Sequence, residues 1–274
     1  RMYWLKAGAG SESNGPAVFA SSNGFLGVYH MGNPANDATA TSARPNSVTY
    51  ISNNGSFNTG ASGYSIREGA VGAADSLPGT GTTEGATGSR VTLGTLGTGT
   101  ISTGEVTLST WVKGNQGGTQ WRSIISLGTL GNCCAATTNG ILLGQAGTGS
   151  NRIGYQVTTN NNPTWPSAAN DSWEVNVWMH LTLSIKNGSG NDTLYKNGVR
   201  IATTGGSDIN VPNASRNANA IGRNIFNGDG TFQGVVDEVR ISNVSRNRHW
   251  VKLDYETSRP GATAVTVGAA TSQA

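Results

Sequence analysis

The sequence has little charge and few aromatic residues for its length. Charged residues make up 12% of the 274 residues, aromatic residues make up 7%, and only three histidines are present. So few charges are unlike a helical cytosolic enzyme, which is rich in Lys and Glu. The 18 Lys and Arg residues are spread among 15 Asp and Glu residues, which excludes the basic stripe of a nucleic-acid-binding protein. In the densest cationic run, Arg240 and Arg246 alternate with Glu238 and Asp254, and we interpret this run as a mixed, solvated surface.

The sequence also lacks long hydrophobic segments. No run of about 18 apolar residues is present, so we expect no direct membrane insertion. The chain starts at Arg1 without the hydrophobic region of a signal peptide, and we expect either that a signal was removed or that this is a piece of a longer protein. Together with the abundant Asn and Thr, the low charge favours an extracellular or cell-surface location, with the periplasm as the alternative.

Several catalytic motifs are missing as well. The sequence contains no His-Glu-x-x-His motif and no P-loop. Its glutamates are scattered, so it lacks the paired carboxylates of a glycoside hydrolase. A polysaccharide lyase would need a cleft that combines residues such as Arg152, Tyr155 and Gln156 with His180, but such residues are common on ordinary strands. We therefore predict that the protein is not an enzyme.

The only two cysteines, Cys133 and Cys134, are adjacent. They can pair with each other only through a strained eight-membered ring. In an oxidising compartment we predict this vicinal disulfide. The alternatives are two reduced thiols or a bond to another chain.

Glycine, by contrast, is abundant. Forty glycines, with Asn, separate short apolar runs every eight to twelve residues, which is typical of an all-β sandwich or barrel. Asn197-Gly198 between two strand-like runs predicts a type I′ hairpin. Residues 248–255 predict one short helical or irregular turn that packs Trp250, Leu253 and Tyr255 on the sandwich. The predicted strands are residues 106–112, 124–127, 141–143, 152–157, 178–185, 193–195 and 199–202.

One acidic residue lies in a strongly apolar strand. Alternation places Asp237 on the same face as Val235, Val239 and Ile241. A buried carboxylate is costly unless a cation or several donors compensate it. Asp237 therefore indicates either a metal site or a capped loop, in which it accepts backbone N–H bonds.

Tryptophan and asparagine gather in the loops between residues 113 and 174. Exposed aromatic rings can stack on sugars, and amides can bind sugar hydroxyls. We expect Trp111 and Trp178, which lie in strands, to be core residues. The predicted ligand-binding residues are Trp165, Asn161, Asn162, Trp121 and Trp173.

Several short motifs occur in a characteristic order along the chain, at residues 25–31, 37–39, 67–74, 108–113, 178–181, 194–198 and 237–242. Their order resembles bacterial laminin-G-like domains of the concanavalin A-like jelly-roll type. The ending of the sequence is similar to the subgroup in which this module follows a domain of unknown function in large surface proteins. On this resemblance we divide the chain into a remnant or terminal strand of a preceding module (1–24), the jelly-roll domain (25–260) and a linker or tail (261–274).

The resemblance implies a fold, a cofactor and a function. The fold is a two-sheet antiparallel β-sandwich of about a dozen strands, often with one structural calcium ion. Asp237, with Asp37 or Asn36, is the implied metal ligand set, and backbone carbonyls and waters would complete it. The implied function is a non-catalytic binding or adhesion module whose partner is a glycan or a cell-surface protein. The alternative is a structural subunit or spacer that self-assembles through strand or edge pairing.

Overall fold

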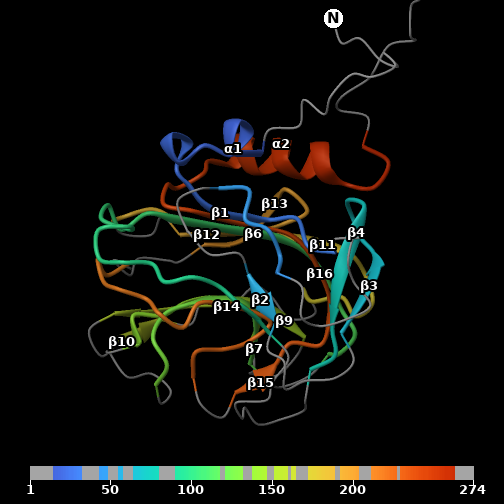
Figure 1. The fold of residues 1–274 in the computed structure, drawn as a ribbon, viewed down its shortest axis with the longest axis horizontal. Coiled ribbons are helices and arrows are strands. Elements are labelled where there is room, and N and C mark those ends of the chain that lie inside the picture. The colour runs from blue at the N-terminus through green and yellow to red at the C-terminus, as the bar shows by residue number, and fades with distance from the viewer. Residues whose placement is uncertain are drawn as a thin grey trace, which may run out of the picture.

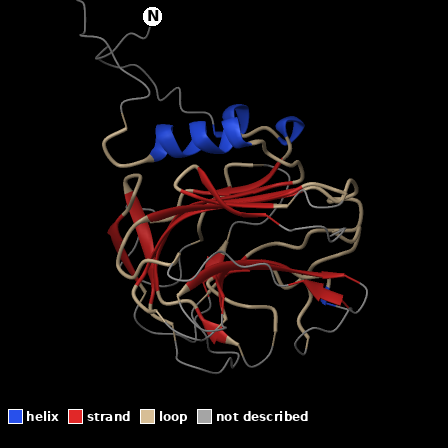
Figure 2. Ribbon diagram, turned by 180° about the vertical axis from the view of Figure 1, so that it is seen from behind, coloured by secondary structure: helices blue, strands red, loops and turns tan. Residues whose placement is uncertain are grey.

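Two β-sheets pack face to face, with a helix across the outside of one of them (Figures 1 and 2). The computed structural model describes residues 15–32, 43–48, 55–57, 64–79, 90–117, 121–131, 138–146, 151–159, 162–164, 172–188, 192–203, 211–226 and 229–262. Apart from one short parallel pair, the strands of both sheets run antiparallel. The predicted two-sheet antiparallel sandwich is confirmed.

The first sheet, called here the helix-side sheet, has eight strands. Seven follow one path, and β1 (Phe25–Tyr29) pairs with β16 off that path. The order along the path is β13 (Val199–Thr203), β12 (Thr193–Lys196), β11 (Met179–Ile185), β6 (Val106–Gly114), β16 (Gly234–Ser242), β4 (Ala73–Leu77) and β3 (Ser65–Glu68).

The second sheet, called the far sheet, also has eight strands. Here β15 (Gly230–Thr231) is the parallel neighbour of β7 off the main path. The order along the path is β10 (Asn162–Thr164), β9 (Arg152–Thr159), β8 (Ile141–Ala146), β7 (Arg122–Leu127), β14 (Ala220–Ile221), β5 (Val91–Thr92) and β2 (Ser56–Phe57).

The main core lies between the two sheets. It is built from aliphatic residues of alternate strand positions, such as Leu108 of β6, Leu143 of β8 and Leu183 of β11, each fully buried. The seven predicted strand runs correspond to β6, β7, β8, β9, β11, β12 and β13. The predicted hairpin is confirmed, because Asn197 and Gly198 both have positive φ, 52° and 74°.

The C-terminal helix is longer than the predicted single turn. α2 runs from Arg248 to Ser258, and the Asn247 side chain caps its first turn by accepting from the amides of His249 and Trp250. Leu253 is 60% exposed, so the prediction that it packs on the sandwich is wrong. Val251 and Asp254 are the residues that α2 buries against the sheet. Among the described residues, no helix is long and apolar enough to cross a membrane.

Strand β16 departs from simple alternation. Val236, Val239 and Ile241 face the core, whereas Asp237 does not. The reason is a β-bulge between Asp237 and Arg240, where Glu238 has a φ of 47° and the pairing with β6 shifts. The extra residue reverses the alternation, so the predicted shared face of Asp237, Val239 and Ile241 is wrong.

The described N-terminal residues are helical turns that pack on the domain. They form α1 (Gly15–Val18) and the 3-10 turn η1 (Ser21–Asn23). The ring of Phe19 meets the ring of Phe25 edge-on, with centroids 5.3 Å apart, in a small cluster that also contains Trp250. Residues 15–24 thus pack against β1 and α2. The predicted domain boundaries stay a prediction.

Candidate ligand-binding sites

The predicted loop site lies largely outside the described residues. Trp165 and Asn161 are among the residues that the structure leaves undescribed, as are Cys133 and Cys134. The backbone of Asn162 begins β10, at the edge of the far sheet. Trp121 is half-buried directly before β7. The ligand-binding role of these residues stays a prediction.

Trp173 is a core residue. Only 3% of it is exposed, and its ring meets the ring of Phe232 edge-on at 6.2 Å. Its indole N–H donates to the carbonyl of Gln116 at 3.1 Å. A Cβ on Gly114 would lie 2.3 Å from the Trp173 ring, so the close packing requires glycine there. The prediction that Trp173 is an exposed ligand-stacking ring is wrong. Trp178, expected in the core, is only half-buried.

Asp237 caps the turn between β3 and β4. Its Oδ2 accepts from the Val71 amide at 2.9 Å, and its Oδ1 accepts from the Glu238 amide at 2.9 Å. A Cβ on Gly69 would lie 2.5 Å from Oδ2, so the turn backbone closes on the carboxyl group. Burial raises the pKa of Asp237 to about 7, despite these donors.

These contacts fit the capped loop better than a calcium site. Calcium takes about six to eight oxygen ligands, whereas the groups that face Asp237 here are N–H donors. Within the described ranges, no three His, Cys, Asp or Glu residues group closely enough to hold a metal ion. Asp37 and Asn36 lie outside those ranges. The calcium ion therefore stays a prediction.

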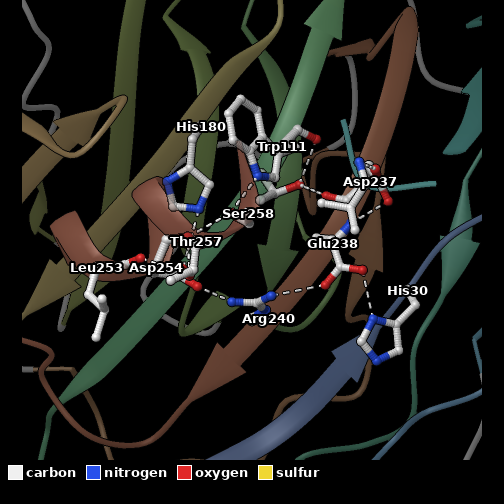
Figure 3. Close-up of polar contacts among 12 residues, drawn as sticks. His30, Trp111, His180, Asp237, Glu238, Arg240, Leu253, Asp254, Thr257 and Ser258 are labelled. Atoms are coloured by element: carbon white, nitrogen blue, oxygen red, sulfur yellow. Dashed lines mark hydrogen bonds and ion pairs between the residues drawn. The ribbon is translucent and has the colours of Figure 1, made fainter. Parts of the chain in front are cut away.

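A chain of five charged and imidazole side chains runs along the outer face of the helix-side sheet, from His180 and Asp254 of α2 at one end to His30 at the other (Figure 3). His30 Nδ1 lies 2.7 Å from Glu238 Oε1, and Arg240 Nη2 donates to Glu238 Oε2 at 3.0 Å. Arg240 Nη1 donates to Asp254 Oδ1. The other oxygen of Asp254 lies 3.3 Å from His180 Nε2. We call this set the α2 clamp.

The α2 clamp is buried except at its His30 end, where the side chain is 45% exposed, and it holds its carboxylates in the charged form. Side-chain exposure is 7% for Glu238, 6% for Asp254 and 15% for Arg240. Burial alone would raise the pKa of Asp254, but His180 and Arg240 outweigh it and hold that pKa below its usual value. His30 and Arg240 do the same for Glu238. The interpretation of Arg240, Glu238 and Asp254 as a solvated surface is wrong, because all three side chains are largely buried and paired with one another.

Aromatic packing completes the attachment of α2. The Trp111 indole N–H donates to Ser258 Oγ at 3.0 Å, and the Trp111 ring lies 5.7 Å from the ring of Tyr255. The ring of His180 packs on both of these rings. His180 thus serves the contact between sheet and helix. Arg152, Tyr155 and Gln156 lie on β9 of the other sheet, so the structure does not bring the lyase-like residues into one cleft.

Three surface cavities are lined by described residues. The first, about 480 Å³, lies between α2 and the β12–β13 hairpin, and we call it the α2 groove. The second, about 420 Å³, shares Thr193, Tyr195 and Arg248 with it and adds Lys186 and Glu105. The third, about 340 Å³, is lined by residues around His30 and Glu238. The lining of the α2 groove is Thr193, Tyr195, Gly198, Arg200, Arg248, His249 and Lys252.

None of these three cavities holds a pair of carboxylates. The α2 groove has none, the second cavity has only Glu105, and the third has only Glu238. Both of these carboxylates are already engaged, Glu105 by the amide of Ser245 and Glu238 in the α2 clamp. Glycoside hydrolysis needs two carboxyl groups about 5 to 10 Å apart across the scissile bond. The three cavities therefore provide surfaces for binding, without the carboxyl pair of a glycosidase.

The fold defines a jelly-roll sandwich of the lectin and glucanase type. A family model, Laminin_G_3, described as the concanavalin A-like lectin/glucanases superfamily, matches residues 85–252, more than half of the chain. The protein belongs to this family. The predicted laminin-G-like, concanavalin A-like resemblance is confirmed at this level. The comparison with curated proteins found no match.

Several solved structures share the fold. Domain 4 of AbnA, an extracellular arabinanase from Geobacillus stearothermophilus, solved with arabinotriose, is 20% identical with a TM-score of 0.59, covering 85% of this chain and 98% of that one. The binding domain of botulinum neurotoxin DC, solved with SialylT, is 11% identical with a TM-score of 0.57, covering 87% of this chain and 52% of that one. A Trypanosoma rangeli sialidase is 13% identical with a TM-score of 0.54, covering 86% of this chain and 33% of that one. At these identities the likeness establishes the fold alone.

Proposed function

We propose that the protein is a non-catalytic, extracellular carbohydrate-binding module of a surface protein. The observation that carries this proposal is that the buried carboxylates of the sandwich are engaged in ion pairs or in capping hydrogen bonds. Those of Glu238, Asp254 and Asp237 are committed to the clamp or to a capped turn. Asp75 is likewise paired with Arg44, which lies 2.6 Å from it. These four carboxylates hold the sandwich together, and this supports binding rather than catalysis as the use of its surface.

Two of the related folds support the choice of a sugar ligand. The arabinanase domain was solved with arabinotriose, and the neurotoxin domain was solved with SialylT. We extend this to the present chain because the family itself groups lectins with glucanases. The predicted contact residues for the sugar are Trp165, Asn161, Asn162 and Trp121. Trp173 is withdrawn from this set because it is buried.

The first experiment is a glycan-array screen of the purified chain, once with calcium and once with a chelator. Trp165→Ala tests the predicted stacking residue, and Leu253→Ala is the matched control because Leu253 is an exposed apolar residue on α2, on the helix side of the sandwich. We expect Trp165→Ala to lose binding and Leu253→Ala to keep it. Binding that survives Trp165→Ala unchanged would refute the loop site. Binding that is insensitive to the chelator would remove calcium from the proposal.

The alternative role, a structural subunit or adhesion spacer that self-assembles through strand pairing, is favoured by one feature. Strand β13 is the last strand on its side of the helix-side sheet, and its Val199 is 65% exposed. An edge strand presents unpaired backbone groups to a second chain. Size-exclusion chromatography over a range of concentrations tests this role. A ladder of oligomers would support assembly, and a single monomer peak would contradict it.

A further inference from the structure

The α2 groove concentrates positive charge. Arg200 projects from β13, while Arg248 and Lys252 lie one turn apart on α2, which places them on the same face of the helix. All three residues are exposed. In the part of the chain that the structure describes, none of the three forms an ion pair, and no carboxylate lines this groove. Arg248 donates only to the neighbouring His249 ring at 3.4 Å. Three cations without a carboxylate partner around one cavity form a site for an anion.

The walls that carry these cations are fixed in place. Gly198, at the hairpin turn with a φ of 74°, approaches α2 so closely that a Cβ there would lie 3.3 Å from the Cα of Lys252. On the other side, Asp254 of α2 is tied to Arg240 and His180 of the sheet. The cations therefore stand on two elements that are already locked together. Such preorganisation lowers the entropy that binding has to offset.

A second cavity adjoins the α2 groove. The groove, of about 480 Å³, and the second cavity, of about 420 Å³, share Thr193, Tyr195 and Arg248 as lining residues, and the second cavity adds the exposed Lys186. Four exposed cations, Arg200, Arg248, Lys252 and Lys186, therefore line two adjoining cavities, and the one carboxylate there, Glu105, accepts from the Ser245 amide. The half-buried Thr193 lines both cavities and can offer its hydroxyl group to a sugar hydroxyl. Cations that are distributed over two adjoining cavities suit a chain with repeated negative charges rather than a single anion.

We propose that the α2 groove binds a linear acidic polysaccharide, whose carboxylate or sulfate groups pair with Arg200, Arg248, Lys252 and Lys186. Single-stranded nucleic acid fits less well. Its binding depends on aromatic faces on which bases stack, whereas the one Tyr in the lining, Tyr195, is only 6% exposed. The α2 groove is a different site from the predicted loop site around Trp165. The groove lies on the helix-side sheet, whereas Trp165 directly follows β10, an edge strand of the far sheet.

The test measures binding of polygalacturonate, dextran sulfate, uncharged dextran and single-stranded DNA by the intact chain at low salt. The test variant is Arg200→Ser with Lys252→Ser. The matched control is Arg67→Ser with Lys113→Ser, which also removes two positive charges but from residues that line none of the three cavities. We expect polygalacturonate or dextran sulfate to bind and the test variant to bind about tenfold more weakly, since each exposed ion pair contributes up to about 1 kcal/mol. The control should bind as the parent does.

The results of this test distinguish specific binding in the α2 groove from general charge attraction. Comparing the two acidic polymers tells carboxylate from sulfate recognition, and high salt should abolish the binding of either because these exposed charges are screened. An equal loss in the test and control variants would mean general charge attraction and would overturn the proposal. Stronger binding of DNA than of both acidic polymers, or no binding of any polymer, would also overturn it. Trp165→Ala should leave this binding unchanged, so a failure of the loop site and a failure of the groove are distinguishable.

Discussion

Arg240 is the residue on which the α2 clamp depends. It bridges Glu238 and Asp254, whose side chains are 7% and 6% exposed, and so it neutralises two largely buried carboxylates. Replacing it by Met keeps most of the apolar stem but leaves two buried negative charges without their guanidinium partner. Breaking a buried ion pair in this way costs about 3–5 kcal/mol. We expect Arg240→Met to lower the free energy of unfolding by that amount at pH 7.5.

The loss of stability in Arg240→Met should become smaller as the pH falls. The clamp holds the pKa values of Glu238 and Asp254 below their usual values. Their contribution to stability is therefore present above the pKa of the unfolded chain and is lost as the pH falls through the folded pKa. In Arg240→Met these carboxyl groups can take up protons on mild acidification. The difference in stability between parent and variant should shrink between pH 7.5 and pH 4.5.

Urea unfolding followed by tryptophan fluorescence measures the loss of stability in Arg240→Met and its change with pH, because Trp111 packs directly under α2. The control is Arg259→Met, which breaks an exposed pair with Glu256 whose partners are each 36% exposed and should cost less than about 1 kcal/mol. A triple variant, Arg240→Met with Glu238→Gln and Asp254→Asn, should recover part of the loss. The reasoning is refuted if Arg240→Met costs less than about 1 kcal/mol, or if its cost is the same at both pH values.

Three further outcomes follow from other parts of the structure. Burial raises the pKa values of Asp237 and Asp192 to about 7 and of Asp229 to about 6. The stability that these protonated carboxyl groups contribute is therefore complete below the pKa of the unfolded chain and is lost as the pH rises through 6 to 7. Thermal unfolding should show a higher Tm at pH 5 than at pH 8, and a flat profile would contradict this. Trp173→Ala should cost about 3–5 kcal/mol in urea unfolding, and a near-neutral effect would contradict its core position. Addition of a chelator should lower the Tm if the predicted calcium ion is bound, and an unchanged Tm would remove the ion.

The strands could be predicted because their signals are local. Runs such as residues 106–112 and 178–185 alternate apolar and polar side chains, and Asn197-Gly198 fixes a hairpin by its backbone preference alone. Each of these signals is contained in a few neighbouring residues. The long-range pairing of the strands then follows from burying their apolar faces.

The bulge and the α2 clamp could not be predicted in the same way. No residue type in β16 marks Glu238 as the residue with positive φ, since the bulge appears only in the pairing of β16 with the distant strand β6. Arg240 and His180 are far apart in sequence and meet only because α2 brings Asp254 between them. Asp254 did carry a weak signal, as it falls on the same helical face as Val251, the other residue that α2 buries.

The central claim is that the protein binds a sugar and leaves it intact. Its most direct test is a calorimetric titration with the oligosaccharide that the array identifies, followed by mass spectrometry of the recovered sugar. The account predicts saturable binding that is lost in Trp165→Ala, with the oligosaccharide recovered at its original mass. Cleavage products, or a folded protein that binds no glycan at all, would contradict it.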